Sequence, residues 1–300
     1  MPATVRFSRW WLVAPALVAM VVLLDRPRQT TALHRAEWLA AADVRVRTVR
    51  AGTGDTTLFL LHGFGESLLT WRSVFDRLAQ RYRVVAIDLP GFAGSEKPEA
   101  SYSLEAMTVR LVSFLDRWID GPTIVVGHSM GGELAAALAL ARPERVKAAV
   151  LIAPAGWTVG LGGIADTMYP TKAQAIGWYL SSRAFLLPEH DLEWMGEPDS
   201  AARYTLMGDP AYRHATARML QEFDFRGMRD RFGEVQQPVL LIWGELDPVI
   251  PFAVADSLAT RLPCSRLLSL PTGLHRPQLE LPDTVAAEVL RFSGDPSCQH

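Results

Sequence analysis

The chain alternates between short apolar runs and longer stretches of helical character. Five runs are almost entirely apolar and are bounded by Gly, Pro or Asp: residues 57–61, 84–87, 123–126, 148–152 and 239–243. Such runs are typical of strands buried on both faces of a parallel sheet. A shorter run at 267–270 predicts one more strand. At residues 44–48 apolar and charged residues alternate, which predicts a half-buried strand at the edge of the sheet.

The regions between the strands predict covering helices and one insertion. Residues 132–142 are rich in Ala and Leu with no helix breaker before Pro143, so we expect a helix that ends there. Residues 155–235 contain several Trp and Met residues and no convincing strand, which predicts a helical cap. The sequence thus predicts an α/β core made of residues 42–154 and 236–294.

The first 33 residues have the composition of a targeting segment. Residues 10–24 carry no charge and follow Arg6 and Arg9. As a helix this run is about 22 Å long, shorter than the roughly 30 Å hydrocarbon core, so it suits a signal peptide as well as an uncleaved anchor. We expect residues 1–33 to anchor the protein through 10–24 or to direct its export to the periplasmic or extracellular face. The alternative is a cytoplasmic protein whose N-terminal helix lies on the fold or on the membrane surface.

Composition excludes some classes of function. The formal net charge is -2, with 30 Lys and Arg against 32 Asp and Glu, so the chain lacks the basic field that nucleic-acid binding needs. Cys264 and Cys298 form neither a CxxC motif nor a Cys/His cluster, and no metal site is expected. Two free thiols are at least as compatible with this spacing as a disulfide formed in an oxidising compartment.

The strongest chemical signal is Gly-His-Ser-Met-Gly-Gly at residues 127–132, between an apolar strand and an Ala-rich helix. In that context G-x-S-x-G predicts a sharp turn that places Ser129 at the carboxyl end of the sheet. The turn strains the serine backbone, and Gly127 and Gly131 leave space for strand and helix to approach. The first amides of the helix favour a developing negative charge. We therefore interpret Ser129 as a nucleophile.

A serine nucleophile needs a base and a carboxylate that orients the base. Asp247 follows the predicted strand 239–243, and His275 follows the predicted strand 267–270. Parallel strands bring their carboxyl ends to one edge of a sheet, so both side chains are expected near Ser129. Glu245 lies in the same loop as Asp247 and is a second candidate for the carboxylate.

The chain order Ser, Asp, His resembles that of the cap-bearing serine hydrolases of the α/β-hydrolase superfamily. The resemblance covers most of residues 42–292. It implies a mostly parallel sheet of eight strands with helices on both faces and a helical cap, and it favours Asp247 over Glu245.

Two further loops carry the resemblance. His62-Gly63-Phe64-Gly65 is similar to the family's oxyanion loop, which implies that the backbone N–H groups of Phe64 and Met130 form the oxyanion hole. Residues 88–95 are similar to the loop after the family's fourth strand, although Ala93 stands where the family usually has Gly.

The resemblance implies hydrolysis of a small ester or acyl substrate. Ser129 would attack the carbonyl with His275 as base, and water would then release the acid from the acyl-enzyme, with no metal or organic cofactor. His128, Trp157 and Trp178 are candidates for the wall of the substrate pocket.

Several other activities stay open as alternatives. Ser129 argues against the epoxide hydrolases and haloalkane dehalogenases of the superfamily, which use Asp at that position. C–C bond hydrolases often carry Asn where His128 stands and Trp where Arg276 stands, and this chain differs from them at both positions. C–C bond hydrolysis, cofactor-free haloperoxidase or perhydrolase chemistry, and a non-catalytic ligand receptor on the same fold remain the alternatives.

Overall fold

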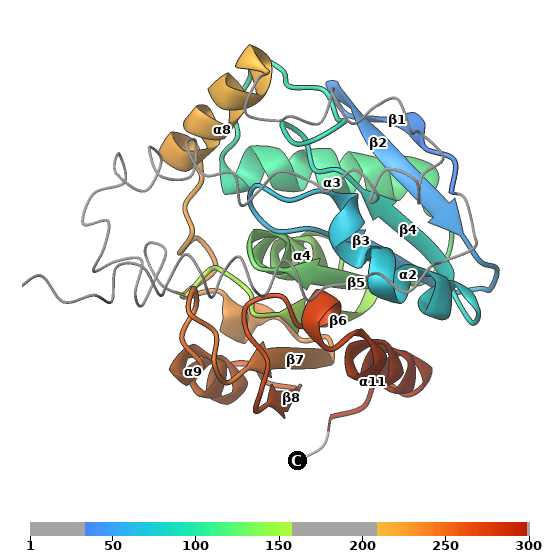
Figure 1. The fold of residues 1–300 in the computed structure, drawn as a ribbon, viewed down its shortest axis with the longest axis vertical. Helices are drawn as coiled ribbons and strands as arrows, with labels where there is room; N and C mark the ends of the chain where they lie inside the picture. Colours follow the sequence, from blue (N-terminus) through green and yellow to red (C-terminus); the bar gives the residue numbers. More distant parts are fainter. Residues whose placement is uncertain (1–33, 158–208, 299–300) are drawn as a thin grey trace, which may run out of the picture.

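The computed structural model describes residues 34–157 and 209–298, which fold around one sheet (Figure 1). Its strands are β1 (Glu37–Ala41), β2 (Val44–Ala51), β3 (Thr57–Leu61), β4 (Arg83–Ile87), β5 (Thr123–His128), β6 (Val146–Ile152), β7 (Val239–Gly244) and β8 (Ser265–Leu270). Their order is β1-β2-β4-β3-β5-β6-β7-β8. The pairs β1–β2 and β2–β4 are antiparallel and all other neighbours are parallel. The predicted mostly parallel sheet of eight strands is confirmed.

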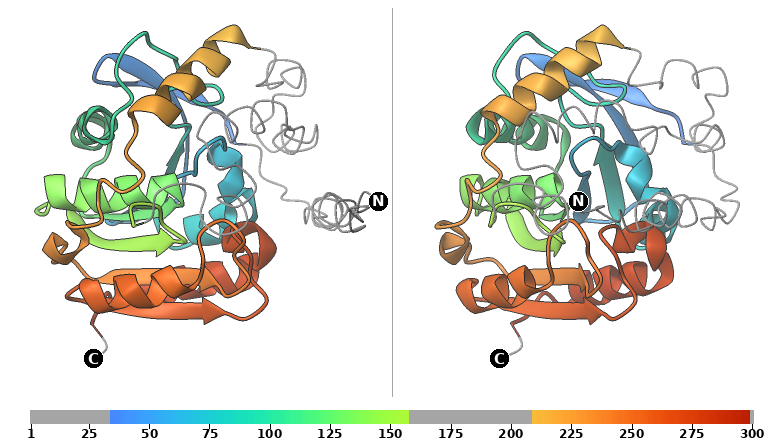
Figure 2. Two further views of the ribbon diagram at one scale, coloured as in Figure 1. Left: turned by 90° about the vertical axis from the view of Figure 1, so that its left-hand side faces the viewer. Right: turned by 60° about the vertical axis from the view of Figure 1, so that its left-hand side comes forward.

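Helices lie on both faces of the sheet. The helices of the described residues are η2 (Leu68–Trp71), α2 (Arg72–Ala79), α3 (Leu104–Trp118), α4 (Met130–Ala141), α8 (Pro210–Glu222), η6 (Phe232–Glu234), α9 (Ala253–Arg261), α10 (Pro277–Glu280) and α11 (Pro282–Gly294). Figure 2 shows α2 and α11 together on one side and α3 and α4 on the other. This arrangement covers the centre of the sheet from both sides.

The central strands are buried as their composition predicts. Every residue of β3, β5 and β7 is buried, because helices cover the sheet on both faces there. Continuous apolar runs fit such positions, since neither face of the strand meets water. These buried strands form a rigid base for the loops at their carboxyl ends.

The prediction of an edge strand at residues 44–48 is wrong. β2 lies between β1 and β4, and β1 is the edge strand. The core therefore begins at Glu37, before the predicted boundary at residue 42. A two-residue turn joins β1 to β2 with Ala42 at φ 56°, a conformation for which the sequence offers no Gly or Asn. Contacts with α3 hold the turn instead: the Ala42 N–H donates to Ser113 Oγ at 2.9 Å, and Asp43 binds the Arg110 guanidinium at 2.8 Å.

The two predicted additions to the core lie largely outside the described residues. Within the predicted cap of residues 155–235, the regular elements of the described part are α8 and η6. Residues 158–208 lie outside the description, as does the predicted signal or anchor segment 1–33. Among the residues that are described, none of the helices has the length and apolar character needed to span a bilayer.

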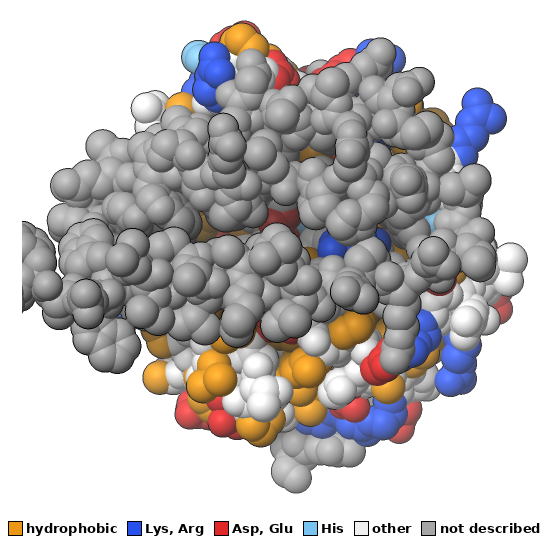
Figure 3. Space-filling view, in the orientation of Figure 1, with side chains coloured by type: hydrophobic (Ala, Val, Ile, Leu, Met, Phe, Trp, Pro, Cys, Tyr) orange, Lys and Arg blue, Asp and Glu red, His pale blue; other side chains and the backbone are white. Residues whose placement is uncertain are grey.

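Cys264 and Cys298 form a disulfide with their Cα atoms 5.1 Å apart. The bridge ties the residue before β8 to the chain that follows α11. Of the two alternatives that the sequence left open, a disulfide and two free thiols, the structure has the disulfide. On the described part of the face in Figure 3, acidic and basic side chains are intermixed, in keeping with the near balance of charges in the sequence.

Candidate active site

The order of the strands identifies one position at the carboxyl ends of the central strands, between β3 and β5. After β3 the chain continues to β4 on one side, whereas after β5 it continues to β6 on the other. Ligands of open α/β sheets bind at the carboxyl ends of strands where the order reverses in this way. Leu61 at the end of β3 is in register with Gly127 near the end of β5. The loops that follow these two strands therefore start side by side.

Ser129 occupies the sharp turn between β5 and α4. Its backbone has φ 52° and ψ −119°, a strained conformation for a residue with a side chain. The Ser129 N–H donates to the carbonyl of Ile152 at 2.9 Å, which fixes the turn to β6. A Cβ on Gly127 would lie 2.1 Å from the carbonyl oxygen of Gly131, and a Cβ on Gly131 would lie 2.3 Å from that of Leu61. Only glycine fits these two close approaches, as the sequence predicts.

The start of α4 presents amides beside the serine. The Ser129 carbonyl accepts the N–H groups of Gly132 at 2.9 Å and Glu133 at 3.2 Å. The Met130 N–H and the Ser129 hydroxyl have no hydrogen-bond partner within residues 34–157 and 209–298. Unpaired amides at a helix N-terminus carry partial positive charge. A negative charge that develops next to Ser129 would thus be stabilised there.

Asp247 and His275 are brought together from the loops after β7 and β8. His275 Nδ1 lies 2.8 Å from Asp247 Oδ2. Asp247 Oδ1 accepts the N–H groups of Val249 at 2.7 Å and Ile250 at 2.9 Å, so backbone bonds fix the carboxylate. Because a carboxylate accepts, the proton lies on His275 Nδ1 and leaves Nε2 with a lone pair. The carboxyl group is fully buried, whereas the imidazole is 16% exposed.

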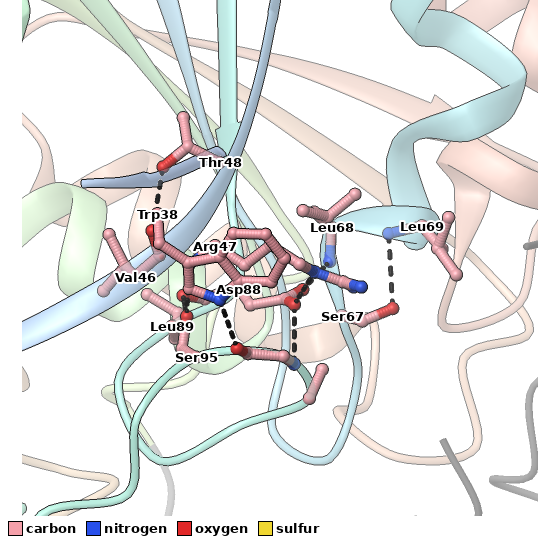
Figure 4. A network of polar contacts seen from close by, with 12 residues as sticks. Trp38, Val46, Arg47, Thr48, Ser67, Leu68, Leu69, Asp88, Leu89 and Ser95 are labelled. Atoms are coloured by element: carbon pink, nitrogen blue, oxygen red, sulfur yellow. Dashed lines mark hydrogen bonds and ion pairs between the residues drawn. The ribbon is translucent and has the colours of Figure 1, made fainter. Parts of the chain in front are cut away.

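Glu245 and Asp88, which also follow strands of the sheet, do not take this position. Glu245 is exposed and binds the hydroxyl of Ser269. Asp88 is fully buried: its Oδ2 accepts from Arg47 Nε at 2.7 Å, and its Oδ1 accepts the Leu68 N–H at 2.7 Å (Figure 4). Asp88 therefore ties β2 to the segment that leads into η2.

Phe64 lies half-buried in the loop after β3. Its ring meets those of Phe92 and Phe225 edge to face, with centroids 5.6 Å and 5.9 Å apart. His62 supports the same loop, because its Nε2 accepts the Leu89 N–H at 2.8 Å. These contacts fix the loop whose backbone is predicted to supply an oxyanion donor.

His128 is 1% exposed and makes two hydrogen bonds that sequence reasoning missed. Its Nδ1 lies 2.9 Å from Glu66 Oε2, and its Nε2 lies 2.8 Å from the carbonyl oxygen of His275. The sequence analysis ended the oxyanion loop at residue 65 and gave Glu66 no role. An acidic residue among apolar ones, just after a buried strand, is the signal that points to it.

The remaining candidates for the pocket are the two tryptophans. Trp157 is half-buried and the Arg229 guanidinium lies over its ring at 5.8 Å from the centroid. Trp178 lies outside the described residues. A pocket role for His128, Trp157 and Trp178 stays a prediction. In the described chain, no group of three His, Cys, Asp or Glu side chains is arranged to hold a metal ion.

Comparison with known proteins agrees with this geometry. The family model for the alpha/beta hydrolase fold matches residues 56–282. The pimeloyl-[acyl-carrier protein] methyl ester esterase of Nitrosomonas europaea is 33% identical over 258 residues, which cover 81% of this chain and 96% of that enzyme.

Two other matches broaden the range of relatives. The dihydrolipoyllysine-residue acetyltransferase component of the acetoin cleaving system of Cupriavidus necator is 34% identical over 71% of this chain, which spans only 58% of that longer protein. The crystal structure of CarC, a serine hydrolase involved in carbazole degradation, aligns with a TM-score of 0.67 and 26% identity over 87% of this chain and 99% of that one. Since the family model matches most of its length, the chain belongs to the α/β-hydrolase family and is a hydrolase.

Proposed function

We propose that the protein is a serine hydrolase that cleaves carboxylic esters through an acyl-enzyme. The observation that carries the proposal is the 2.8 Å hydrogen bond between His275 Nδ1 and Asp247 Oδ2, made by loops at the same edge of the sheet as the strained Ser129. A hydrogen-bonded base and carboxylate at the same end of the sheet as a serine on such a turn are the groups that nucleophilic acyl transfer uses.

In the first half-reaction the Ser129 hydroxyl attacks the ester carbonyl and His275 Nε2 takes the proton. Asp247 keeps the imidazole in the tautomer whose Nε2 can accept, and it stabilises the imidazolium that forms. His275 then gives the proton to the leaving alcohol. In the second half-reaction His275 removes a proton from water, which attacks the acyl-enzyme and releases the acid.

The oxyanion of both tetrahedral intermediates would be held by backbone N–H groups. The Met130 N–H stands at the start of α4, and Phe64 lies in the loop that begins next to β5. One such donor typically contributes about 10² to 10³ in rate. Because these donors belong to the backbone, side-chain substitutions test them poorly.

Ester hydrolysis is favoured over C–C bond hydrolysis by two observations. The methyl ester esterase that this chain resembles is matched over nearly its whole length. His128 and Arg276 differ from the residues that C–C hydrolases often carry, and His128 is buried with both ring nitrogens in hydrogen bonds. The relative's name suggests methyl esters of acyl chains as the first substrate class to test.

A fluorophosphonate probe on the full chain, followed by peptide mapping, tests the nucleophile. We expect the adduct on Ser129, its loss in Ser129→Ala and its near loss in His275→Ala. Ser257→Ala, a change in α9, is the matched control and should label normally. Folded protein without an adduct would favour the non-catalytic receptor.

A series of methyl and aryl esters of increasing acyl length then tests the substrate class. We expect turnover of esters, with a preferred chain length set by the cap. Turnover of a vinylogous diketone without turnover of any ester would favour the C–C hydrolase. Halide oxidation or peracid formation as the main reaction would favour the haloperoxidase or perhydrolase alternative.

We also propose that the body of the protein lies in an oxidising compartment. The Cys264–Cys298 disulfide supports this location, because structural disulfides persist mainly in exported proteins. The uncharged run at residues 10–24 is the segment that would direct export or hold the protein at a membrane. Sequencing the N-terminus of the mature protein distinguishes a cleaved leader from an anchor. An intact Met1 in a soluble cytosolic fraction would contradict both.

A further inference from the structure

Two buried histidines adjoin the site, and their partners differ. His62 Nδ1 lies 2.7 Å from the carbonyl oxygen of Gly63, and His62 Nε2 accepts the Leu89 N–H at 2.8 Å. One ring nitrogen donates and the other accepts, which is the pattern of a neutral imidazole. Burial lowers the pKa of His62, in agreement with this state.

His128 faces acceptors on both sides. Its Nε2 lies 2.8 Å from the carbonyl oxygen of His275, which can only accept, so Nε2 carries a proton. Its Nδ1 lies 2.9 Å from Glu66 Oε2. The second proton of the pair therefore lies either on His128, giving an ion pair, or on Glu66, giving a neutral pair.

The surroundings of Glu66 favour the ion pair. The Gly63 N–H donates to the same Oε2 atom at 3.0 Å, so this oxygen already acts as an acceptor. Burial alone would raise the pKa of Glu66, but the charge and hydrogen bond of His128, together with the charge of Arg276, hold it below its usual range. Burial and Arg276 oppose a charge on His128, but the Glu66 carboxylate and the carbonyl of His275 raise the pKa of His128 above its usual value.

We propose that Glu66 and His128, whose side chains are 13% and 1% exposed, form a largely buried ion pair. Its imidazolium donates to the carboxylate and to the backbone carbonyl of His275, and the pair thereby positions His275 against Ser129. The proposal rests on the proposed function for the role of His275. It makes Glu66 and His128 positioning residues, since neither takes part in the proton transfers of the reaction.

The position of the pair explains how it would act. Glu66 belongs to the loop after β3, His128 is the last residue of β5 and precedes Ser129, and His275 follows β8. One imidazolium therefore links all three loops, and the rings of His128 and His275 lie 4.8 Å apart. Gly63 is needed for this contact, because a Cβ there would lie 2.9 Å from His128 Nδ1.

Glu66→Gln is the informative variant. Without the carboxylate charge, His128 is expected to lose its Nδ1 proton, and Nδ1 then needs a donor. A single amide atom cannot both accept the Gly63 N–H and donate to His128 Nδ1, so the variant loses the charge and one of the two contacts. Glu66→Asp keeps the charge on a shorter side chain. The matched control is Glu99→Gln, since Glu99 also pairs with a histidine, His214, at 3.1 Å but on the surface.

The first measurement is the ¹⁵N-histidine NMR spectrum of the full chain near pH 8. We expect one imidazolium with two slowly exchanging ring N–H protons, retained in Glu66→Asp and Glu99→Gln and lost in Glu66→Gln. A neutral tautomer at His128 in the wild type would overturn the ion pair. This measurement needs no substrate, so it stands or falls separately from the proposed function.

The second measurement is kinetic. A loss of position of about 1 Å at the base costs on the order of 10²-fold, so we expect Glu66→Gln to lower kcat and the rate of fluorophosphonate labelling about 10- to 100-fold with little change in KM. Glu66→Asp should fall between it and the wild type. Wild-type kcat in a Glu66→Gln protein would overturn the positioning role. If Glu66→Gln does not fold, the positioning role would be overturned by a Glu66→Asp protein that has a neutral His128 and the wild-type kcat. Wild-type protein without ester turnover or adduct would refute the proposed function and leave the NMR result in force.

Discussion

Asp247→Asn tests how the carboxylate orients the base. The two hydrogen bonds from Val249 and Ile250 to Oδ1 decide which way the new amide turns. With its oxygen on these N–H groups, the Asn side chain points its NH₂ group at His275 Nδ1. That nitrogen must then accept, the imidazole proton moves to Nε2, and no lone pair is left for the Ser129 hydroxyl.

The magnitude follows from the cost of the opposite orientation. To present an oxygen to His275, the substituted side chain would leave the N–H groups of half-buried Val249 and buried Ile250 facing its NH₂, at about 1 to 3 kcal/mol each. A total of about 2 to 6 kcal/mol corresponds to a loss of about 30-fold to about 3 × 10⁴-fold in kcat/KM. The same change in a serine protease triad lowers kcat by about 10⁴, so we expect a result near the upper limit.

The assay is kcat/KM for an aryl acetate at neutral pH, with Ser129→Ala as the baseline and thermal unfolding as the test of fold. The matched control is Glu245→Gln in the same loop. Because the Glu245 side chain is exposed and contacts Ser269, this change should stay within about threefold of the wild type. A folded Asp247→Asn protein that keeps more than about a tenth of the wild-type kcat/KM would refute the tautomer argument.

Three predictions concern stability. Gly127→Ala should lower the free energy of unfolding by about 3 kcal/mol or more, measured by urea denaturation, because the new Cβ would lie 2.1 Å from the carbonyl oxygen of Gly131; a change below about 1 kcal/mol would contradict the close approach. Cys264→Ser should lower it by about 3 to 4 kcal/mol, since the bridge to Cys298 closes a loop with a sequence separation of 34, and a reductant should have the same effect on the wild type only. Glu133→Gln should change how the free energy of unfolding depends on pH, because burial raises the pKa of Glu133 well above its usual value of 4.5. The neutral Glu133 side chain contributes fully to stability below pH 4.5. This contribution is lost by up to about 1.4 kcal/mol per pH unit as the pH rises toward the folded-state pKa. The advantage of the Gln variant over the wild type should therefore grow as the pH rises above about 5, and equal slopes would show that Glu133 is ionised in the folded protein.

The centre of the sheet was predictable because its composition is decided by burial alone. The runs at 57–61 and 239–243 lie in β3 and β7, where every residue is buried. The edge was not predictable in the same way. β1 is held through a turn at Ala42 that depends on Ser113 and Arg110 of α3, and a local pattern carries no trace of such distant contacts.

The same distinction applies to the site. The places of Ser129, Asp247 and His275 follow from strand ends, and strand ends are visible in the sequence. Glu66 acts through a residue 62 positions later, and its partner is known only once β3 and β5 are paired. The disulfide was equally out of reach, because the position of Cys298 depends on where α11 ends in space.

The bridge between Cys264 and Cys298 encloses the whole stretch that carries β8, the His275 loop, α10 and α11. A protease that cuts once inside this ring leaves both fragments attached to one another through sulfur. Nicked molecules would thus run as a single band on a non-reducing gel and separate only after reduction. In a protease-rich environment, one cut would not detach the segment that carries the proposed base.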